Sequence, residues 1–231
     1  GLTSLKVSSA IMGPGLTWMS GLTKLEKLDV RGGKNLVSFA GVPAAPQLRQ
    51  AVFSNTFAAD LTPLKAFSGL KSLELRVSAV TDLAPLGDLA SLESLNLEEA
   101  KVKDLSPLAK CAALRTLFIS KMKNLDHSSL GKVTQLTTLF SRQNSMQDIS
   151  WLARLSNLQT LSLNRENITD YSPLAKLTPE YLVLGDMNSE AVDLGFLSGM
   201  TSLKRLSLKD LKNVSSLASL QNLTALTSLE L

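Results

Sequence analysis

The sequence has few of the residue types that most catalytic and metal sites need. Its 231 residues include one cysteine, Cys111, and one histidine, His127. A single cysteine excludes an internal disulfide and leaves the redox compartment open. The two residues lie in different repeats of the pattern described below, so we expect neither a cysteine–histidine nucleophile nor a histidine-based metal site. No G-x-S-x-G, P-loop, H-E-x-x-H or Rossmann glycine motif occurs. We therefore expect a protein that is not an enzyme and has no cofactor.

Charge of one sign and long apolar runs are also scarce. The net charge is +4, from 24 basic and 20 acidic residues, and the basic residues form only short clusters such as the interrupted pair Lys121 and Lys123. Nucleic-acid-binding proteins concentrate basic residues in a stripe, so we expect no nucleic-acid partner. An apolar run of about 18 residues, which a membrane span needs, is absent. No signal peptide or lipidation motif is found, and the compartment stays unassigned.

The apolar residues that are present follow one phrase, LxxLxxLxL. Its third apolar position falls at Leu5, Leu28, Ala51, Leu73, Leu95, Leu117, Leu139, Leu161, Leu182, Leu206 and Leu229. These positions are 21 to 24 residues apart, and this phrase with a period of about 20–29 residues is typical of a leucine-rich repeat solenoid. No linker interrupts the period, so residues 1–231 are expected to form a single leucine-rich repeat domain. Because both ends fall within a repeat and no polar capping unit is visible, we expect a domain truncated at one or both ends.

Residues 89–110 show how one repeat is built. The alternation Leu95, Asn96, Leu97 predicts a short strand with one buried face. Apolar residues then recur three apart up to Leu108, which suits a helical or 3-10 return turn. Ser106 followed by proline predicts an N-cap hydroxyl and a proline in the first turn. Stacked repeats then predict a right-handed α/β solenoid, with a parallel concave sheet of about 11 strands and short helical turns on the convex side.

A column of aspartates precedes the return turns. Its members are Asp60, Asp82, Asp104, Asp126, Asp148, Asp170 and Asp193. Stacked carboxylates repel each other, so we expect each to accept backbone N–H bonds within its own turn. A calcium ladder is the alternative, which the single carboxylate per repeat and the lack of a glycine-rich ligand loop disfavour.

One segment departs from the repeat. Residues 31–67 contain Gly32, Gly33, Pro43 and Pro46, and the two prolines are expected to break the return helix. Local looseness and a partner-contact loop are both compatible with this pattern.

The repeats resemble those of known proteins. The strand phrase, together with Asp-Leu-Ser-Pro-Leu-Ala at 104–109, Asp-Leu-Ala-Pro-Leu at 82–86 and Asp-Tyr-Ser-Pro-Leu-Ala at 170–175, is similar to the short leucine-rich repeats of bacterial internalins and of a protein-phosphatase regulatory subunit. The asparagine ladder of that family is mostly replaced here, by Ser78, Ala100 and Glu166, with Asn144 retained. The resemblance therefore implies the family's scaffold with looser or differently bonded turns.

The residue between the last two apolar positions of each strand should face solvent on the concave side. In order these are Lys6, Asp29, Val52, Glu74, Asn96, Phe118, Phe140, Ser162, Val183, Ser207 and Glu230. Phe118 and Phe140 are expected on adjacent strands, where large exposed aromatics favour a binding hot spot. We expect Thr116, Thr138, Arg142, Tyr181 and Val183 to flank them. The alternative is that the two rings pair across strands and only stabilise the sheet.

The sequence thus favours a protein-interaction module that binds a partner protein through its concave face. A broad open face makes a small-molecule ligand a poor expectation. The resemblance to internalins implies a bacterial surface or secreted host-interaction protein. Two alternatives remain: an intracellular structural or regulatory scaffold, and the targeting arm of a larger multidomain enzyme.

Overall fold

The computed structural model describes residues 1–8, 13–185, 192–209, 214 and 216–231. The chain comprises two compact units, Gly1–Phe118 and Ile119–Leu231, called the first and second unit below. The expectation of a single domain stays a prediction, and each unit is described by itself.

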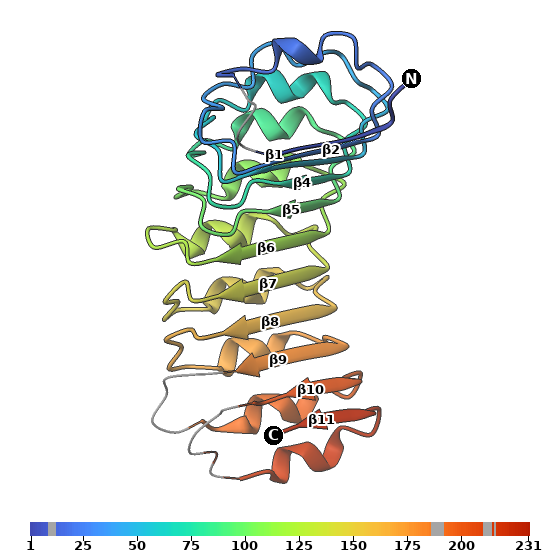
Figure 1. Cartoon of the computed structure of the whole chain (residues 1–231). Helices are drawn as coiled ribbons and strands as arrows, with labels where there is room; N and C mark the ends of the chain where they lie inside the picture. Colours follow the sequence, from blue (N-terminus) through green and yellow to red (C-terminus); the bar gives the residue numbers. More distant parts are fainter. Residues whose placement is uncertain (9–12, 186–191, 210–213, 215) are drawn as a thin grey trace. The chain divides into compact units, whose positions relative to one another are not determined.

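The described residues form eleven strands, all parallel, that follow the order of the chain (Figure 1). The first unit contains β1 (Ser4–Ser8), β2 (Lys27–Arg31), β3 (Gln50–Ser54), β4 (Ser72–Glu74) and β5 (Ser94–Asn96), and the unit boundary falls within β6 (Thr116–Ser120). The second unit contains β7 (Thr138–Arg142), β8 (Thr160–Asn164), β9 (Tyr181–Gly185), β10 (Arg205–Ser207) and β11 (Ser228–Glu230). The third apolar positions of neighbouring repeats are paired, as in Leu73 with Leu95 and Leu161 with Leu182. The solenoid predicted from the leucine phrase is therefore confirmed.

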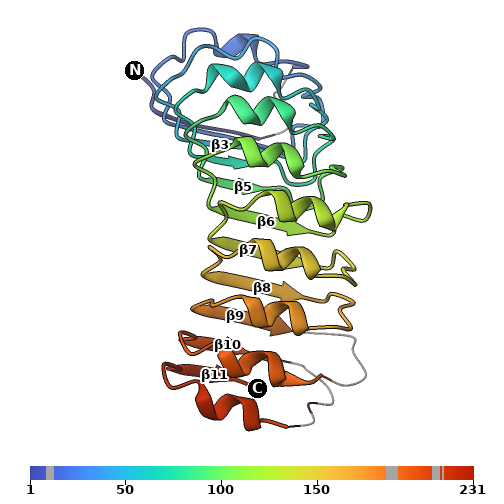
Figure 2. The ribbon, with the colours of Figure 1, turned by 180° about the vertical axis from the view of Figure 1, so that it is seen from behind.

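Short 3-10 helices return the chain on the side away from the strands (Figure 2). They are η2 (Thr17–Met19), η3 (Thr62–Ala66), η4 (Ala84–Asp88), η5 (Ser106–Lys110), η6 (His127–Lys132), η7 (Ser150–Arg154), η8 (Ser172–Lys176), η9 (Leu194–Gly199) and η10 (Ala218–Asn222). No helical turn forms between β2 and β3, a segment that is described throughout. This outcome confirms that Pro43 and Pro46 break the return helix, since proline lacks the N–H that such a turn uses.

The core of each unit is a stack of leucines. Leu73, Leu95 and Leu117 of the strand column are at most 1% exposed, and burial of one such side chain stabilises the fold by about 1.5–3 kcal/mol. Cys111 lies in the same core, where its Sγ donates a hydrogen bond to the carbonyl of Leu86 at 3.3 Å. Burial raises the pKa of this thiol to about 11. Cys111 therefore fills a core position, and a thiol that stays protonated is a poor nucleophile.

The aspartate column has the predicted role. Each of the seven carboxylates accepts the backbone N–H two residues further on, at 2.7–3.0 Å. The N–H and hydroxyl bonds of Ser172 hold the pKa of Asp170 below its ordinary value. One expectation was wrong: the hydroxyl of Ser106 does not cap its helix but donates to Asp104 Oδ2 at 2.8 Å. The carboxylate is the stronger acceptor and already holds the Ser106 amide, so the hydroxyl acts as a donor.

The turns after the strands repeat a left-handed backbone conformation that the leucine phrase does not reveal. A positive φ of 51–59° recurs every 22 residues, at Asn55, Val77, Glu99, Lys121, Gln143 and Arg165. For a β-branched residue such as Val77 this conformation is strained. The positions form a column that follows the strands.

Where the asparagine ladder is replaced, the turns of the second unit are differently bonded rather than loose. Glu166 is fully buried, and its Oε2 accepts the backbone N–H groups of Asn144 and Met146, each at 3.0 Å. Its Oε1 accepts the hydroxyl of Ser141 at 2.8 Å. Asn144 in turn accepts the N–H of Met122 through Oδ1 at 2.9 Å. Burial raises the pKa of Glu166, against the opposing effect of these hydrogen bonds.

Candidate functional site

Strands β7 to β10 of the second unit present a regular array of side chains. Register aligns Thr138, Thr160, Tyr181 and Arg205 at the strand starts and Phe140, Ser162, Val183 and Ser207 in the middle. Arg142, Asn164 and Gly185 align at the strand ends. Because neighbouring strands are about 4.8 Å apart, residues separated by one strand are within reach of one bound chain. We call this array the strand face of the second unit.

Five of the predicted site residues belong to this strand face. Thr138, Phe140, Tyr181 and Val183 are half-buried and Arg142 is exposed. Thr116 and Phe118 are half-buried on β6, with Phe118 in register with Asn96 of the first unit. Phe118 and Phe140 therefore lie in different units, and their pairing stays a prediction.

One residue of the predicted solvent-facing column is not exposed. Ser162 is only 6% exposed, and its Oγ accepts the side-chain amide of Asn164 at 2.7 Å. Its register neighbours are Phe140 and Val183. A small side chain between two larger ones is shielded from solvent, which alternation along the strand does not predict.

The starts of the strands carry an aromatic–cation contact. The guanidinium of Arg205 lies over the ring of Tyr181, 5.5 Å from its centroid. Such a contact contributes about 0.5–1 kcal/mol at an exposed site. The contact therefore favours one orientation of the Tyr181 ring.

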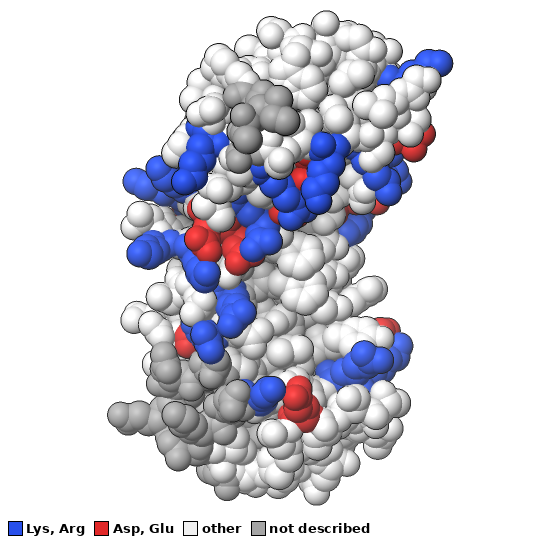
Figure 3. All heavy atoms as spheres, in the orientation of Figure 1, with Lys and Arg blue, Asp and Glu red and all other residues white. Residues whose placement is uncertain are grey.

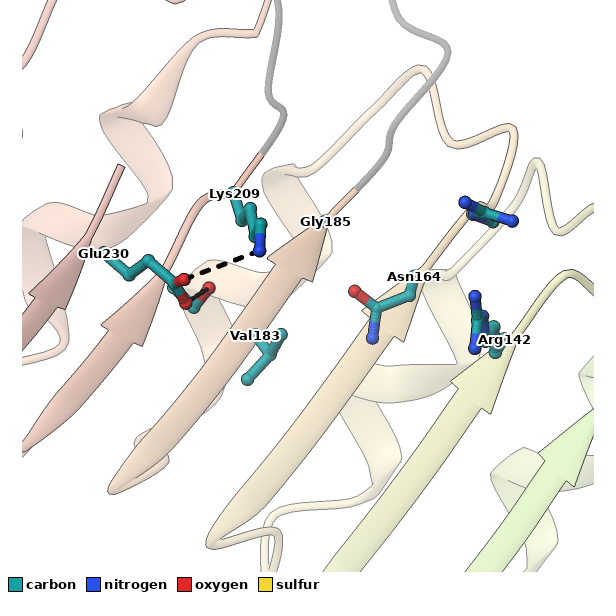
Figure 4. Close-up of a pocket in the computed structure, with 8 residues that line it drawn as sticks. Arg142, Asn164, Val183, Gly185, Lys209 and Glu230 are labelled. Atoms are coloured by element: carbon teal, nitrogen blue, oxygen red, sulfur yellow. Dashed lines mark hydrogen bonds and ion pairs between the residues drawn. The ribbon is translucent and has the colours of Figure 1, made fainter.

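The ends of the strands surround a hollow of about 420 Å³ (Figure 4). It is lined by Arg142, Asn164, Arg165, Val183, Gly185, Ser207, Lys209 and Glu230, and we call it the strand-end hollow. Sequence reasoning identified Arg142 and Val183 as site residues and placed Ser207 and Glu230 in the solvent-facing column. It missed the other four. Arg165 belongs to the left-handed column, whose period of 22 residues was the available signal.

Gly185 allows the side chain of Asn164 on the adjacent strand to approach closely. A Cβ added to Gly185 would lie 2.5 Å from Asn164 Oδ1, well inside contact distance. The amide oxygen of Asn164 therefore occupies space that any other residue type at position 185 would fill. Figure 4 shows the two residues on adjacent strands, with Arg142 on the next strand along.

The arrangement of strands and turns is shared with solved structures. The internalin InlF of Listeria monocytogenes is 19% identical with a TM-score of 0.67, covering 100% of this chain and 87% of the other. Internalin C2 of Listeria monocytogenes is 28% identical with a TM-score of 0.65, covering 77% of this chain and 79% of the other. Mouse RP105, solved in complex with MD-1, is 18% identical with a TM-score of 0.70, covering 99% of this chain and 42% of the other. No protein-family model and no curated protein matches. The chain is a leucine-rich repeat protein with internalin-like repeats.

Figure 3 shows cations of this leucine-rich repeat protein on the face that carries the strands, with carboxylates beside some of them. In the first unit those at the strand ends are neutralised: Arg31 Nε is 2.9 Å from Asp29 and Arg76 Nη2 is 2.9 Å from Glu98. In the second unit, the described residues that line the strand-end hollow include three cations and one carboxylate. Lys209 Nζ is 4.0 Å from Glu230 Oε1, and both side chains are more than half exposed. An exposed pair at that distance is weak, so Glu230 neutralises little of the charge of Lys209.

The described residues also offer no metal site and no membrane-spanning helix. No group of three or more His, Cys, Asp or Glu there could hold a metal ion. His127 is half-buried, its Nε2 has no hydrogen-bond partner among the described residues, and burial lowers its pKa. Within the same residues, no helix combines the length and the hydropathy that crossing a bilayer requires.

Proposed function

We propose that this protein is a protein-interaction module whose strand face in the second unit binds a partner protein. The observation that carries the proposal is the array itself. Phe140, Tyr181 and Val183 are half-buried on neighbouring strands, and the strand-end hollow, which Val183 also lines, lies at the ends of the same strands. Aromatic residues and arginine are the types most enriched in binding hot spots.

The similar folds support the same proposal. Mouse RP105 is solved in complex with MD-1, which makes it a leucine-rich repeat protein that binds another protein. The two Listeria internalins support the finer part of the proposal, that this chain is a bacterial surface or secreted protein that interacts with a host.

The proposal is tested by mapping contacts on the whole chain. A photo-crosslinking residue replaces Phe140 on the strand face or, as the matched control, exposed Lys176 at the end of η8 on the turn side. Each protein is exposed to cells of a candidate host and, in a separate experiment, to a bacterial lysate. Crosslinked proteins are then identified by mass spectrometry. We expect one specific partner to be crosslinked from position 140 and not from position 176.

The affinity of each variant for the purified partner is then measured. Phe140→Ala and Tyr181→Ala should each weaken binding by about tenfold or more, whereas Lys176→Ala should leave the affinity unchanged. The double variant Phe118→Ala/Phe140→Ala tests the predicted aromatic centre in the same assay, with thermal melting to show that it is folded. Unchanged partner binding by the folded double variant and by Tyr181→Ala would remove the strand face as the contact surface.

A further inference from the structure

The strand-end hollow presents Arg142, a cation suited to an anionic group. Among the described residues, Arg142, Arg165, Lys209 and the carboxylate of Glu230 line it. Its volume of about 420 Å³ lies within the range of about 300–1,000 Å³ typical of ligand sites. Cations gathered around a concave surface raise the local concentration of anions and speed their association.

Arg142 carries the argument because its counterparts in other repeats are neutralised. Arg31 and Arg76 occupy the same position, three residues after the third apolar residue of their repeats, and each is bonded to a carboxylate of the first unit at 2.9 Å. In the part of the chain that the structure describes, Arg142 has no carboxylate partner and its side chain is exposed. Its guanidinium is therefore available for a carboxylate from outside, which it can bind through two parallel N–H···O bonds.

The same hollow also offers acceptors. Asn164 uses Nδ2 to donate to Ser162 Oγ, so its Oδ1 is directed to the space above Gly185. At the far side, Glu230 is held by the hydroxyl of Ser207 at 2.8 Å. An amide oxygen and a carboxylate repel a bare sulfate or phosphate, but they suit the N–H groups of a peptide backbone. The mixture of cations and acceptors in the hollow therefore matches a polypeptide with acidic side chains.

We propose that the strand-end hollow binds an acidic segment of the partner protein, with an Asp or Glu carboxylate on Arg142 and a backbone N–H on Asn164. The inference rests on the proposed function, since it assigns part of that partner's chemistry. It adds a specific contact that is separate from the aromatic contact at Phe140.

The experiment measures binding of a fluorescently labelled peptide of alternating Glu and Gly to the whole chain by anisotropy, at low and at moderate salt. Arg142→Gln should weaken binding by about ten- to hundredfold, the loss of a charge-assisted pair. Arg76→Gln, the matched control with the same charge change at the same repeat position, should change it less than about twofold. Glu230→Gln should strengthen binding, because it removes the like charge from the hollow. Arg142 is exposed, so we expect Arg142→Gln to melt at the wild-type temperature.

Several results would overturn the inference. Equal losses for Arg142→Gln and Arg76→Gln would mean that the peptide binds through general positive charge. Equal binding of a peptide with Gln in place of Glu would exclude carboxylate recognition. Tighter binding of a sulfated oligosaccharide, lost in Arg142→Gln and not displaced by the acidic peptide, would assign the hollow to a glycan.

The failure of this inference and that of the proposed function are distinguishable. If the peptide does not bind but Phe140→Ala abolishes binding of the crosslinked partner, only the acidic-segment contact is wrong. If the peptide binds through Arg142 while no partner depends on Phe140 or Tyr181, the hollow is a peptide site and the aromatic contact is wrong.

Discussion

Glu166 provides the sharpest test of how the second unit is held together. Glu166→Ala removes the acceptor of two buried backbone N–H groups, those of Asn144 and Met146, each bonded at 3.0 Å. A buried polar group left without a partner costs about 1–3 kcal/mol. The hydroxyl of Ser141 loses Glu166 but keeps the side-chain amide of Asn144 at 2.8 Å. Relief of the burial of the carboxylate offsets part of the loss, so we expect the free energy of unfolding to fall by about 2–4 kcal/mol.

Glu166→Gln separates the hydrogen bonds from the charge. Its amide oxygen can accept the same two N–H groups, so the loss at neutral pH should stay below about 1 kcal/mol. Burial raises the pKa of Glu166 above its ordinary value of 4.5. Between 4.5 and the raised pKa the folded protein binds more protons at this site than the unfolded protein does, so this group destabilises the fold as pH rises through that window. The stability of the wild type relative to Glu166→Gln should therefore decrease as pH rises from the ordinary pKa through the raised pKa of the folded protein.

Urea unfolding followed by tryptophan fluorescence and circular dichroism measures both effects, since Trp151 is buried in the same unit. The matched control is Glu93→Ala, which removes an exposed carboxylate whose ion pair with Lys71 is 2.7 Å long, and it should cost less than about 1 kcal/mol. Two results would refute the reasoning: Glu166→Ala as stable as Glu93→Ala, or a difference between wild type and Glu166→Gln that does not change with pH.

Three further predictions concern single positions. Gly41 has φ +84°, and a Cβ there would lie 2.8 Å from backbone atoms of Thr17, so Gly41→Ala should lower the free energy of unfolding by about 1–3 kcal/mol. The control Gly21→Ala, where a Cβ would meet nothing within 4 Å, should change it by less than about 0.5 kcal/mol. Equal effects of the two substitutions in urea titrations would contradict this account. Cys111, with a pKa of about 11 against an ordinary 9.0, should be alkylated at pH 8 at least about a hundredfold more slowly in the folded chain than in urea, and rapid modification of the folded chain would show that the thiol is not buried. Asp148→Ala removes the acceptor of the Ser150 amide at 2.7 Å and should cost about 0.5–2 kcal/mol, so a melting temperature equal to that of the wild type would deny the aspartate column its structural role.

Local and periodic features of this protein could be predicted from the sequence. The leucine phrase predicts the strands, their parallel order and their register, because a repeat can bury its apolar residues only against an identical neighbour. The aspartates form bonds two residues along the chain, so their role needs no knowledge of the tertiary structure. The prolines at 43 and 46 end a helix by their own covalent geometry.

Features that depend on contact between repeats were decided only by the tertiary structure. The alternation of the strand places Ser162 on the solvent side, but its neighbours on β7 and β9 cover it. Glu166 looks like an ordinary charged turn residue, and its burial follows from the amides of the preceding turn that it accepts. The close approach of Asn164 to the adjacent strand is possible because Gly185 has no side chain. The sequence determines which strand residues alternate and which turns form, because both depend on short-range geometry. The shielding of a side chain from solvent, the pairing of charges and the shape of a hollow depend on side chains some 22 residues apart, which meet only when the repeats stack.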